Sequence, residues 1–393
     1  MKKYVMLFLM AIAIVIVSCE KMEEISNVNQ TIEFITHTET VIPGQYIVVF
    51  ESSGLKSAYK NKEDANRAVL AKAQTIGTSA KVDLSEPKML YSSALEGIVV
   101  KISENEAQTL ELTAGVKGVY PDKMVTLKKP GTDPADPPAE TIPYGITRVG
   151  GGTTYTGSGK AWIIDTGIDL DHPDLVVDQS SGATFIDRTT TPEDDNGHGT
   201  HCAGIVAAID NEIGVVGVAA GAIVIPVKVL DRKGSGAYSV IIAGVDYVAA
   251  NATDGDVANM SLGGGVYEPI DEAVVALANA GILVALAAGN ESDDANNHSP
   301  ARANAANIYT VSAMDSNDNF AYFSNYGNPP IDCCAPGVSI LSTYKGGAYA
   351  TMSGTSMAAP HVCGLLLATE GELATSGYVN GDPDGEPDPI AHM

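Results

Sequence analysis

Basic residues are scarce in this 393-residue sequence: 23 Lys and Arg stand against 48 Asp and Glu, and the formal net charge is −25. A surface that binds nucleic acid must be basic to neutralise the phosphate backbone, so this balance argues against nucleic acid as a partner. The acidity favours solubility and an extracellular location, and a well-solvated surface is enough to explain it.

Cysteine is also scarce, with five residues in the chain. Four of them lie beyond the N-terminal apolar run, which is too few for a disulfide framework. A bond between the adjacent Cys333 and Cys334 would close a strained ring. The sequence leaves open whether both are buried thiols or one is bridged to Cys363.

Aromatic residues make up only 6% of the chain, whereas glycine is abundant at 40 residues and hydrophobic residues reach 45%. That content is ample for at least one large buried core, which argues against a disordered chain. Apolar runs such as 161–164 and 282–286, with so many glycines, indicate an α/β protein whose close-packed turns need small residues.

The N-terminus has the layout of a secretory signal: Lys2 and Lys3, then the apolar run 4–17, then a small residue and Cys19. The end of this stretch, Ile-Val-Ser-Cys, resembles a bacterial lipobox, in which the cysteine is lipidated and becomes the mature N-terminus. We therefore expect residues 1–19 to be a lipoprotein signal that tethers the protein to a membrane of the bacterial cell envelope. An ordinary cleaved signal peptide, with simple secretion, is the alternative.

Residues 20–40 are polar and lack a sustained period, as in a flexible spacer, and a regular pattern follows over 41–128. That pattern predicts a small ferredoxin-like α+β domain of order β-α-β-β-α-β. Its second helix opens with the capping-box signature Ser103-Glu104-Asn105-Glu106. The expected elements are strands 46–50, 88–91, 97–102 and 116–120, and helices 62–80 and 103–110.

The segment 129–140 is rich in proline and acidic residues, which predicts an exposed linker before a second domain at 141–393. In that domain apolar strands alternate with helices, which predicts a doubly wound, mainly parallel α/β sheet. The acidic tail 380–389 predicts an irregular segment. The expected strands are 161–164, 223–229, 257–260, 282–287 and 308–311, and the expected helices are 239–250 and 270–280.

Two motifs bring an acid and a base to this sheet. Asp165 directly follows the strand 161–164, at the carboxyl end where open α/β sheets place their sites, although an aspartate there can also cap a turn. Glycines flank His198 in the run NGHGTH at the start of a helical segment. Imidazole titrates near neutrality, so His198 is the expected general base, and His201, one helical turn later, is interpreted as structural.

A third motif, GTSMAAPH, predicts a tight turn that delivers Ser356 to a helix N-terminus. Pro360 is expected in the first turn of that helix, where its missing amide costs little. Nearby amides would stabilise negative charge in front of the serine, but an N-cap role explains the serine equally well. Asn290 follows the strand 282–286 and offers an amide donor that would complete an oxyanion hole with the Ser356 amide.

The four motifs DTGID, NGHGTHCAG, AAGN and GTSMAAPH occur in this order over about residues 143–369 and resemble the subtilisin family of serine proteases, most closely its proteinase K branch. The resemblance implies a subtilisin-like fold and a catalytic triad of Asp165, His198 and Ser356, with Asn290 in the oxyanion hole. It also implies that two short segments pair with the substrate backbone as a strand. These are Gly234, Ser235 and Gly236, and Ser261, Leu262 and Gly263.

Residues 45–127 are similar to the inhibitory propeptide of such enzymes, which assists folding, blocks the cleft with its end and is removed by self-cleavage. The cut is expected between about Leu127 and Thr141. The partners would be polypeptide substrates and the chain's own propeptide, and the enzyme would be a monomer that requires no cofactor. Cys202 matches a free thiol of the proteinase K branch, and Asp332 lies near a calcium site of that branch, so a structural calcium ion stays open.

Two other interpretations compete with this one. A metallohydrolase built on Asp165, His198, His201 and the acidic cluster at 169–174 is disfavoured, because the spacing is not the zinc signature HExxH and a metal site has no need of GTSMAAPH. An inert, lipid-tethered binding or inhibitor protein could share the fold, but it would have no need to keep every catalytic residue. The sequence therefore predicts a secreted serine endopeptidase made as a zymogen.

Overall fold

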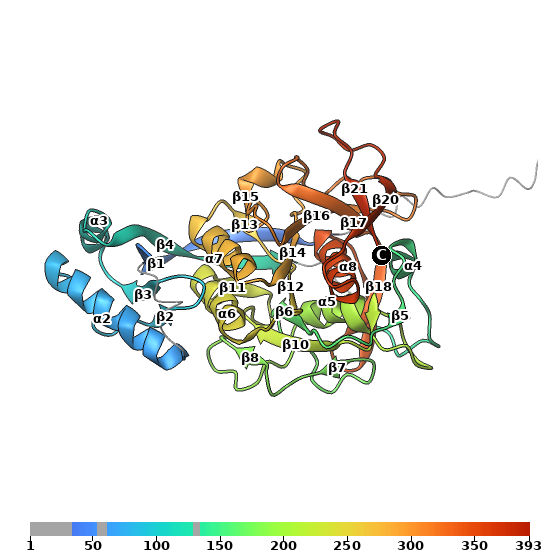
Figure 1. The fold of residues 1–393 in the computed structure, drawn as a ribbon, viewed down its shortest axis with the longest axis horizontal. Coiled ribbons are helices and arrows are strands. Elements are labelled where there is room, and N and C mark those ends of the chain that lie inside the picture. The colour runs from blue at the N-terminus through green and yellow to red at the C-terminus, as the bar shows by residue number, and fades with distance from the viewer. Residues whose placement is uncertain (1–33, 53–60, 129–133) are drawn as a thin grey trace, which may run out of the picture. The chain divides into compact units, whose positions relative to one another are not determined.

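The structure is a computed structural model that describes residues 34–52, 61–128 and 134–393 (Figure 1). The predictions for the signal segment 1–19 and for the lipidation of Cys19 lie outside the described residues, as does part of the predicted linker. None of the helices within the described ranges is long and apolar enough to cross a membrane.

The N-terminal part forms an antiparallel sheet with two helices packed against it, in the predicted order β-α-β-β-α-β (Figure 1). The strand order β4-β1-β3-β2 is continued at one edge by β11, a short strand of the following domain. Apolar side chains of both helices, such as Val69 and Leu110, pack against Val48 and Ile98 of the sheet. The elements are β1 (Thr36–Phe50), α2 (Lys62–Ala80), β2 (Met89–Tyr91), β3 (Gly97–Lys101), α3 (Glu104–Glu111), β4 (Val116–Lys128) and β11 (Ser235–Ala237).

Local signals placed the helices of this domain correctly. Helix α2 has the predicted bounds, and the Asn61 side chain caps it by accepting from the Asp64 amide. The capping box before α3 is present in both halves, because Ser103 accepts from the Glu106 amide and the Glu106 side chain accepts from the Ser103 amide.

Two strands are longer than predicted, and the same ladder explains both. Strand β1 begins at Thr36, so the spacer predicted at 20–40 is wrong for residues 36–40. Strand β4 continues past Tyr120 to Lys128. The added halves pair with each other from Thr36 opposite Lys128 to Val41 opposite Lys123. These segments lack strong apolar alternation, and their backbone amides are satisfied by long-range pairing instead.

The larger domain is built on a ten-stranded, mainly parallel sheet of order β20-β21-β17-β16-β14-β12-β6-β10-β7, with β8 pairing β10. This confirms the predicted doubly wound class. The strands are β6 (Ala161–Asp165), β7 (Val176–Val177), β8 (Ala183–Thr184), β10 (Ile223–Lys228), β12 (Val257–Met260), β14 (Leu283–Ala287), β16 (Ile308–Met314), β17 (Ile331–Pro336), β20 (Ala374–Tyr378) and β21 (Pro389–His392). The tail predicted to be irregular therefore enters a strand at Pro389.

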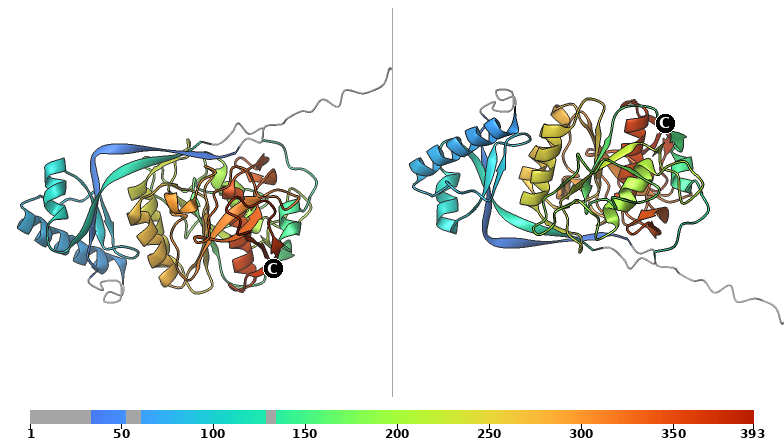
Figure 2. Two further views of the ribbon diagram at one scale, coloured as in Figure 1. Left: turned by 90° about the horizontal axis from the view of Figure 1, so that it is seen from above. Right: turned by 90° about the horizontal axis from the view of Figure 1, so that it is seen from below.

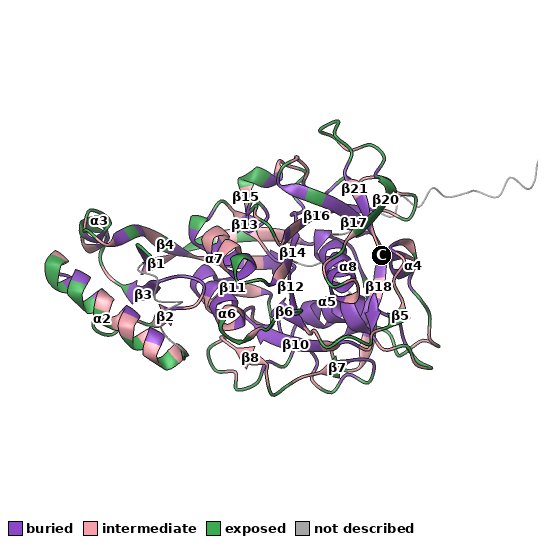
Figure 3. Cartoon of the chain, in the orientation of Figure 1, coloured by how far each residue is buried: buried purple, intermediate pink, exposed green. Residues whose placement is uncertain are grey.

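Helices cover both faces of this sheet: α5 and α8 pack together on one face, and α6 and α7 on the other (Figure 2). Helix α8 is deeply placed, with every residue from Thr355 to Leu367 buried (Figure 3). A helix that is apolar on all sides belongs in the core. The helices are α4 (Tyr144–Arg148), α5 (His198–Ala207), α6 (Tyr238–Asn251), α7 (Glu268–Asn279), α8 (Thr355–Ala368) and the short η1 (Ala295–Asn297).

Three two-stranded ladders complete the domain beside the main sheet. They join β5 (Thr153–Thr154) to β9 (Ala219–Ala220), β13 (Gly264–Gly265) to β15 (His298–Ser299), and β18 (Ile340–Tyr344) to β19 (Ala348–Met352). The carboxyl ends of β6, β12 and β14 and the N-termini of α5 and α8 carry the residues singled out from the sequence. This is the edge at which open α/β sheets place their sites.

Candidate active site

A buried acid and a buried imidazole lie in direct contact at this edge. His198 Nδ1 is 2.8 Å from Asp165 Oδ1 and 2.9 Å from Oδ2, and the two residues are 1% and 0% exposed. A carboxylate can only accept a hydrogen bond, so Nδ1 carries a hydrogen and is the donor of the hydrogen bond to Asp165. The other ring nitrogen, Nε2, then presents a lone pair, and it has no hydrogen-bond partner in the structure.

The glycines around His198 are there because the backbone leaves no room for side chains. Gly197 has a φ of +107°, a conformation that L side chains rarely adopt. A Cβ on Gly199 would collide with the carbonyl oxygen of Gly167, in the turn that follows Asp165. The NGHG run therefore brings the start of α5 close enough to the end of β6 for His198 to reach Asp165.

Ser356 is the second residue of α8, at the end predicted from the motif. Its hydroxyl donates to the carbonyl oxygen of Ser261 at 3.2 Å, so in this structure the hydroxyl is not bonded to His198. Pro360 was predicted in the first turn of the helix, and this is wrong, because it lies one turn further along. Pro360 has no N–H to donate to the Ser356 carbonyl, four residues earlier in the helix. That carbonyl accepts instead from Ser261 Oγ at 2.8 Å and from Cys202 Sγ at 3.4 Å.

Asn290 follows β14 and is held by the start of α8. Its Oδ1 accepts from the Thr355 amide at 2.8 Å and from the Thr355 hydroxyl at 3.0 Å. These two contacts orient the amide, and its buried Nδ2 has no partner. A Cβ built on Gly354 would lie 3.5 Å from Asn290 Nδ2 and 3.6 Å from the Ser356 amide nitrogen. Both donors therefore border the same space beside Gly354, as an oxyanion hole requires.

The metal interpretation does not fit the positions of its residues. Asp165, His198 and Cys202 form the one group of possible ligands within the described part of the chain whose atoms all lie within 4.8 Å of one another. Burial raises the pKa of the Cys202 thiol well above its usual range. His201, which the metal interpretation requires, is not part of this group. His201 Nε2 lies 3.1 and 3.0 Å from the carbonyl oxygens of Ile340 and Ala350, which confirms its structural role.

The cysteines of the described part of the chain form no disulfide bond. Cys202, Cys333, Cys334 and Cys363 are all buried and free, which settles the pairing that the sequence left open. Burial raises the pKa of each thiol, so these cysteines act as small core residues.

One of the two predicted substrate-binding segments is paired with a strand of the chain itself. Ser235 lies opposite Thr126 and Gly236 opposite Val125, and the Leu127 amide donates to the Gly234 carbonyl at 2.8 Å. On its other side β4 pairs with β1. The second predicted segment, Ser261–Gly263, has no ladder to β4 in the described ranges; Ser261 contacts Ser356, and Leu262 and Gly263 line a small pocket.

That pocket holds residues that sequence reasoning missed. His37 lies in it, with Nδ1 3.0 Å from Glu291 Oε1, and Glu39 lies two residues further along β1. His37 and Glu39 fall in the segment predicted to be a spacer, and Glu291 was passed over beside Asn290. No local pattern marks them, because His37 and Glu291 meet through a side-chain contact between segments far apart in the sequence.

The small domain docks on α6 and α7. The Asp246 carboxylate of α6 accepts from the backbone amides of Ser92, Ser93 and Ala94 at 3.1, 2.6 and 2.7 Å, and it pairs with Lys62 at 3.1 Å. Three N–H donors and an ammonium group satisfy a carboxylate that is 1% exposed.

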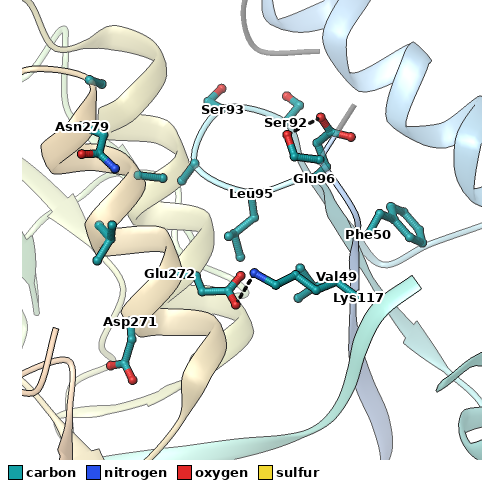
Figure 4. A pocket seen from close by; sticks show the side chains of 15 residues that line it. Val49, Phe50, Ser92, Ser93, Leu95, Glu96, Lys117, Asp271, Glu272 and Asn279 are labelled. Carbon is teal, nitrogen blue, oxygen red and sulfur yellow. Dashed lines mark hydrogen bonds and ion pairs between the residues drawn. The ribbon is translucent and has the colours of Figure 1, made fainter. Parts of the chain in front are cut away.

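A second carboxylate fixes the other side of this interface, and a cavity lies between the two domains. Asp122 of β4 accepts from the Ser239 amide in the first turn of α6 at 3.1 Å. A cavity of about 620 Å³ lies between the small domain and α7, and Lys117 and Glu272 form an ion pair of 2.6 Å there (Figure 4). None of the predicted site residues lines this cavity, so it is a gap in a docking surface and not the active site.

Comparisons with known proteins agree with this geometry. Residues 162–372 match the model of the Subtilase family, and residues 45–128 match that of the Peptidase inhibitor I9 family. A cuticle-degrading protease of Metarhizium anisopliae is 34% identical over 389 residues, covering 91% of this chain and 92% of that protein. An extracellular serine proteinase of Thermus sp. (strain Rt41A) is 37% identical over 368 residues, covering 89% and 83%. The crystal structure of a cold adapted subtilisin-like serine proteinase has a TM-score of 0.54 and 34% identity, covering 64% of this chain and 98% of that one.

Proposed function

The chain belongs to the subtilase family of serine proteases, and from that premise we propose that Asp165, His198 and Ser356 form its catalytic triad, with Asn290 in the oxyanion hole. The protein is a serine endopeptidase made as a zymogen with an inhibitory propeptide. The observation that carries the triad is the bond from His198 Nδ1 to the buried Asp165, which leaves a buried and unpartnered Nε2.

The reaction follows from these positions. The Ser356 hydroxyl leaves the Ser261 carbonyl and turns to His198 Nε2, which takes its proton as Oγ attacks the carbonyl carbon of a peptide bond. The negative charge on the carbonyl oxygen is held by Asn290 Nδ2 and the Ser356 amide. His198 then gives the proton to the leaving amine, and an acyl-enzyme remains. Water, deprotonated by His198, attacks the acyl carbon and releases the acid and the serine.

We further propose that substrates bind as an extended strand along Gly234, Ser235 and Gly236 on one side and Ser261, Leu262 and Gly263 on the other. The ladder between β11 and β4 supports this, since main-chain bonds already hold a strand of the propeptide at the first segment. Self-cleavage would fall between about Leu127 and Thr141, directly after this strand.

Several finer features belong to the same proposal. Cys19 would be lipidated and hold the enzyme on a membrane of the bacterial cell envelope, and the enzyme would act as a monomer. Calcium is not needed for any step, because the chemistry rests on side chains and amides. A structural calcium ion stays open. The Asp332 carboxylate, near the calcium site of the proteinase K branch, accepts from the Thr310 amide at 2.8 Å, and burial raises its pKa to about 6.

The test compares residues 20–393 with and without Ser356→Ala. We expect the parent chain to shorten near the predicted linker on a gel and to hydrolyse an unstructured protein, and the variant to do neither while remaining folded. A folded parent chain that stays full length and inactive would instead favour the inert binding protein.

A further inference from the structure

We propose that residues 34–41 form a second inhibitory strand that occupies the substrate groove of the zymogen, with His37 filling the pocket beside the oxyanion donors. The inference rests on the proposed function, because a groove can be blocked only if it is a groove for substrate. The strand lies before the part of the chain that matches the Peptidase inhibitor I9 family, which is residues 45–128.

The backbone of this segment lies beside β4, which belongs to the part of the chain that matches the inhibitor family. Residues 36–41 pair with residues 123–128 of β4, whose opposite edge pairs with β11. The segment therefore adds a further strand on the side of β4 that faces away from β11. The second predicted substrate segment, Ser261–Gly263, lies near this strand, because His37 lines one pocket with Leu262 and Gly263. Glu39 also accepts from the Gly265 amide of β13.

His37 occupies a side-chain pocket in the wall of the groove. The pocket is formed by Leu262–Gly264 and Ala287–Gly289 and is closed by Glu291 and His298. The His37 side chain is 5% exposed, and a cavity of only about 10 Å³ remains around it. Asn290, the oxyanion donor, lies between Gly289 and Glu291 in the chain. A substrate side chain entering here would have to displace the imidazole.

Polar contacts hold the strand at His37 and at Glu39. His37 Nδ1 lies 3.0 Å from Glu291 Oε1. Glu39 Oε1 accepts from the Gly265 amide at 2.7 Å and from the Tyr238 hydroxyl at 2.8 Å, and Glu39 Oε2 pairs with Lys123 at 3.0 Å. The carboxylate of Glu39 thus joins β1 to β13, to α6 and to β4 in one cluster.

The start of the strand is anchored close to the catalytic serine. The Ile35 amide donates to the Ser353 carbonyl at 3.4 Å, three residues before Ser356 in the chain. The Phe34 ring stacks on Phe323 with ring centroids 4.8 Å apart and meets Tyr322 edge-on at 5.6 Å. A cut between Leu127 and Thr141 leaves all of these contacts in place, because none of them involves the linker. The groove would therefore stay closed until the whole small domain dissociates.

The test follows the lag before activity appears in the full chain, residues 20–393, with a fluorogenic peptide substrate. The variants His37→Ala and Glu39→Gln are compared with Thr38→Ala, a matched control on the exposed face of the same strand. Loss of a charge-assisted hydrogen bond should speed release of the propeptide by roughly tenfold or more, so the lag should shorten in the first two variants only. All three changes lie in the propeptide, so the final activity per processed molecule should be equal.

A lag that is the same in His37→Ala, Glu39→Gln and the control overturns the proposal. If a propeptide variant yields no processed band because it fails to fold, Glu291→Gln removes the same contact from the enzyme side, and an unchanged lag there likewise overturns the proposal. A parent chain that never becomes active is a different result, since it contradicts the proposed function itself.

Discussion

At the scale of single residues, the site depends on two buried nitrogen atoms that the folded chain leaves without partners. His198 Nε2 and Asn290 Nδ2 are both buried and both unsatisfied. A buried donor or acceptor without a partner costs free energy, so such atoms are rare unless a ligand completes them. Here each has a neighbour that fixes its direction: Asp165 holds the imidazole, and Thr355 holds the amide.

Replacement of Asn290 by Ala should lower kcat by roughly 10² to 10³ with little change in KM, because the lost donor acts on the oxyanion and not on the bound peptide. Steady-state kinetics of the processed enzyme measures both constants. The matched control is Asn296→Ala, an exposed asparagine in η1. A fall in kcat below twofold, or a change confined to KM, would exclude Asn290 from the oxyanion hole.

At the scale of elements, helix α8 carries the serine and also carries a titratable group with no charged partner. His361 is buried one turn after Met357, and its Nδ1 donates to the Met357 carbonyl at 2.8 Å. Burial lowers the pKa of His361 to about 4, with the Met357 hydrogen bond opposing the shift. A proton added at Nε2 would be buried without an acceptor.

The pH dependence of stability follows from this shift. In the unfolded chain His361 takes up a proton near its usual pKa of 6.5, whereas in the folded chain it does so only near 4. The unfolded state therefore binds more protons between these values, and the free energy of unfolding should fall as the pH is lowered from about 6.5 towards 4. Urea unfolding of the Ser356→Ala chain at several pH values measures it. The variant His361→Gln should flatten this part of the profile, and an unflattened profile contradicts the assignment.

The elements also show what sequence reasoning can and cannot reach. Helices α2 and α3 were placed well because capping residues and periodicity are local signals. Two of the proposed triad residues, His198 and Ser356, stood out because glycines lie beside them: side chains at 197 and 199 would collide with neighbouring atoms, and Gly354 has a φ of +153°. The first half of β1 and the second half of β4 were missed, because only their mutual pairing makes them strands.

Pro360 shows the same limit at one position. Its tolerance depends on Ser261 and Cys202, which reach the Ser356 carbonyl from other elements. The sequence offers no sign that donors from two distant segments replace a helical amide. The first-turn interpretation was therefore the natural one from local rules, and it was wrong for a tertiary reason.

At the scale of the whole molecule, the propeptide and the enzyme are joined by contacts of different kinds. One is the strand ladder in the groove, from β11 through β4 to β1. Another is the docking surface on α6 and α7. There the Asp246 and Asp122 carboxylates each accept hydrogen bonds from backbone amides on the other side of the interface. Ser356 is fully buried in this state, and the segment before β1 reaches its neighbourhood through the bond from the Ile35 amide to the Ser353 carbonyl.

Replacement of Asp246 by Ala should loosen this interface strongly, because three backbone amides and the Lys62 ammonium lose their shared acceptor. We expect faster amide hydrogen exchange in β2 and in the loop 92–96, measured in the Ser356→Ala chain so that the proposed self-cleavage does not interfere. The matched control is Asp254→Ala, an exposed aspartate just beyond α6. Equal exchange in both variants would show that Asp246 does not hold the domain.

The most direct test of the central claim is to label the processed enzyme with a fluorophosphonate and to locate the adduct by peptide mass spectrometry. The account predicts one adduct, on Ser356, with none on Ser261 or Ser353 nearby. It also predicts that His198→Ala abolishes the adduct, because the base that removes the serine proton is gone. An active enzyme that carries no adduct on Ser356, or a His198→Ala chain labelled at the parent rate, would contradict the account.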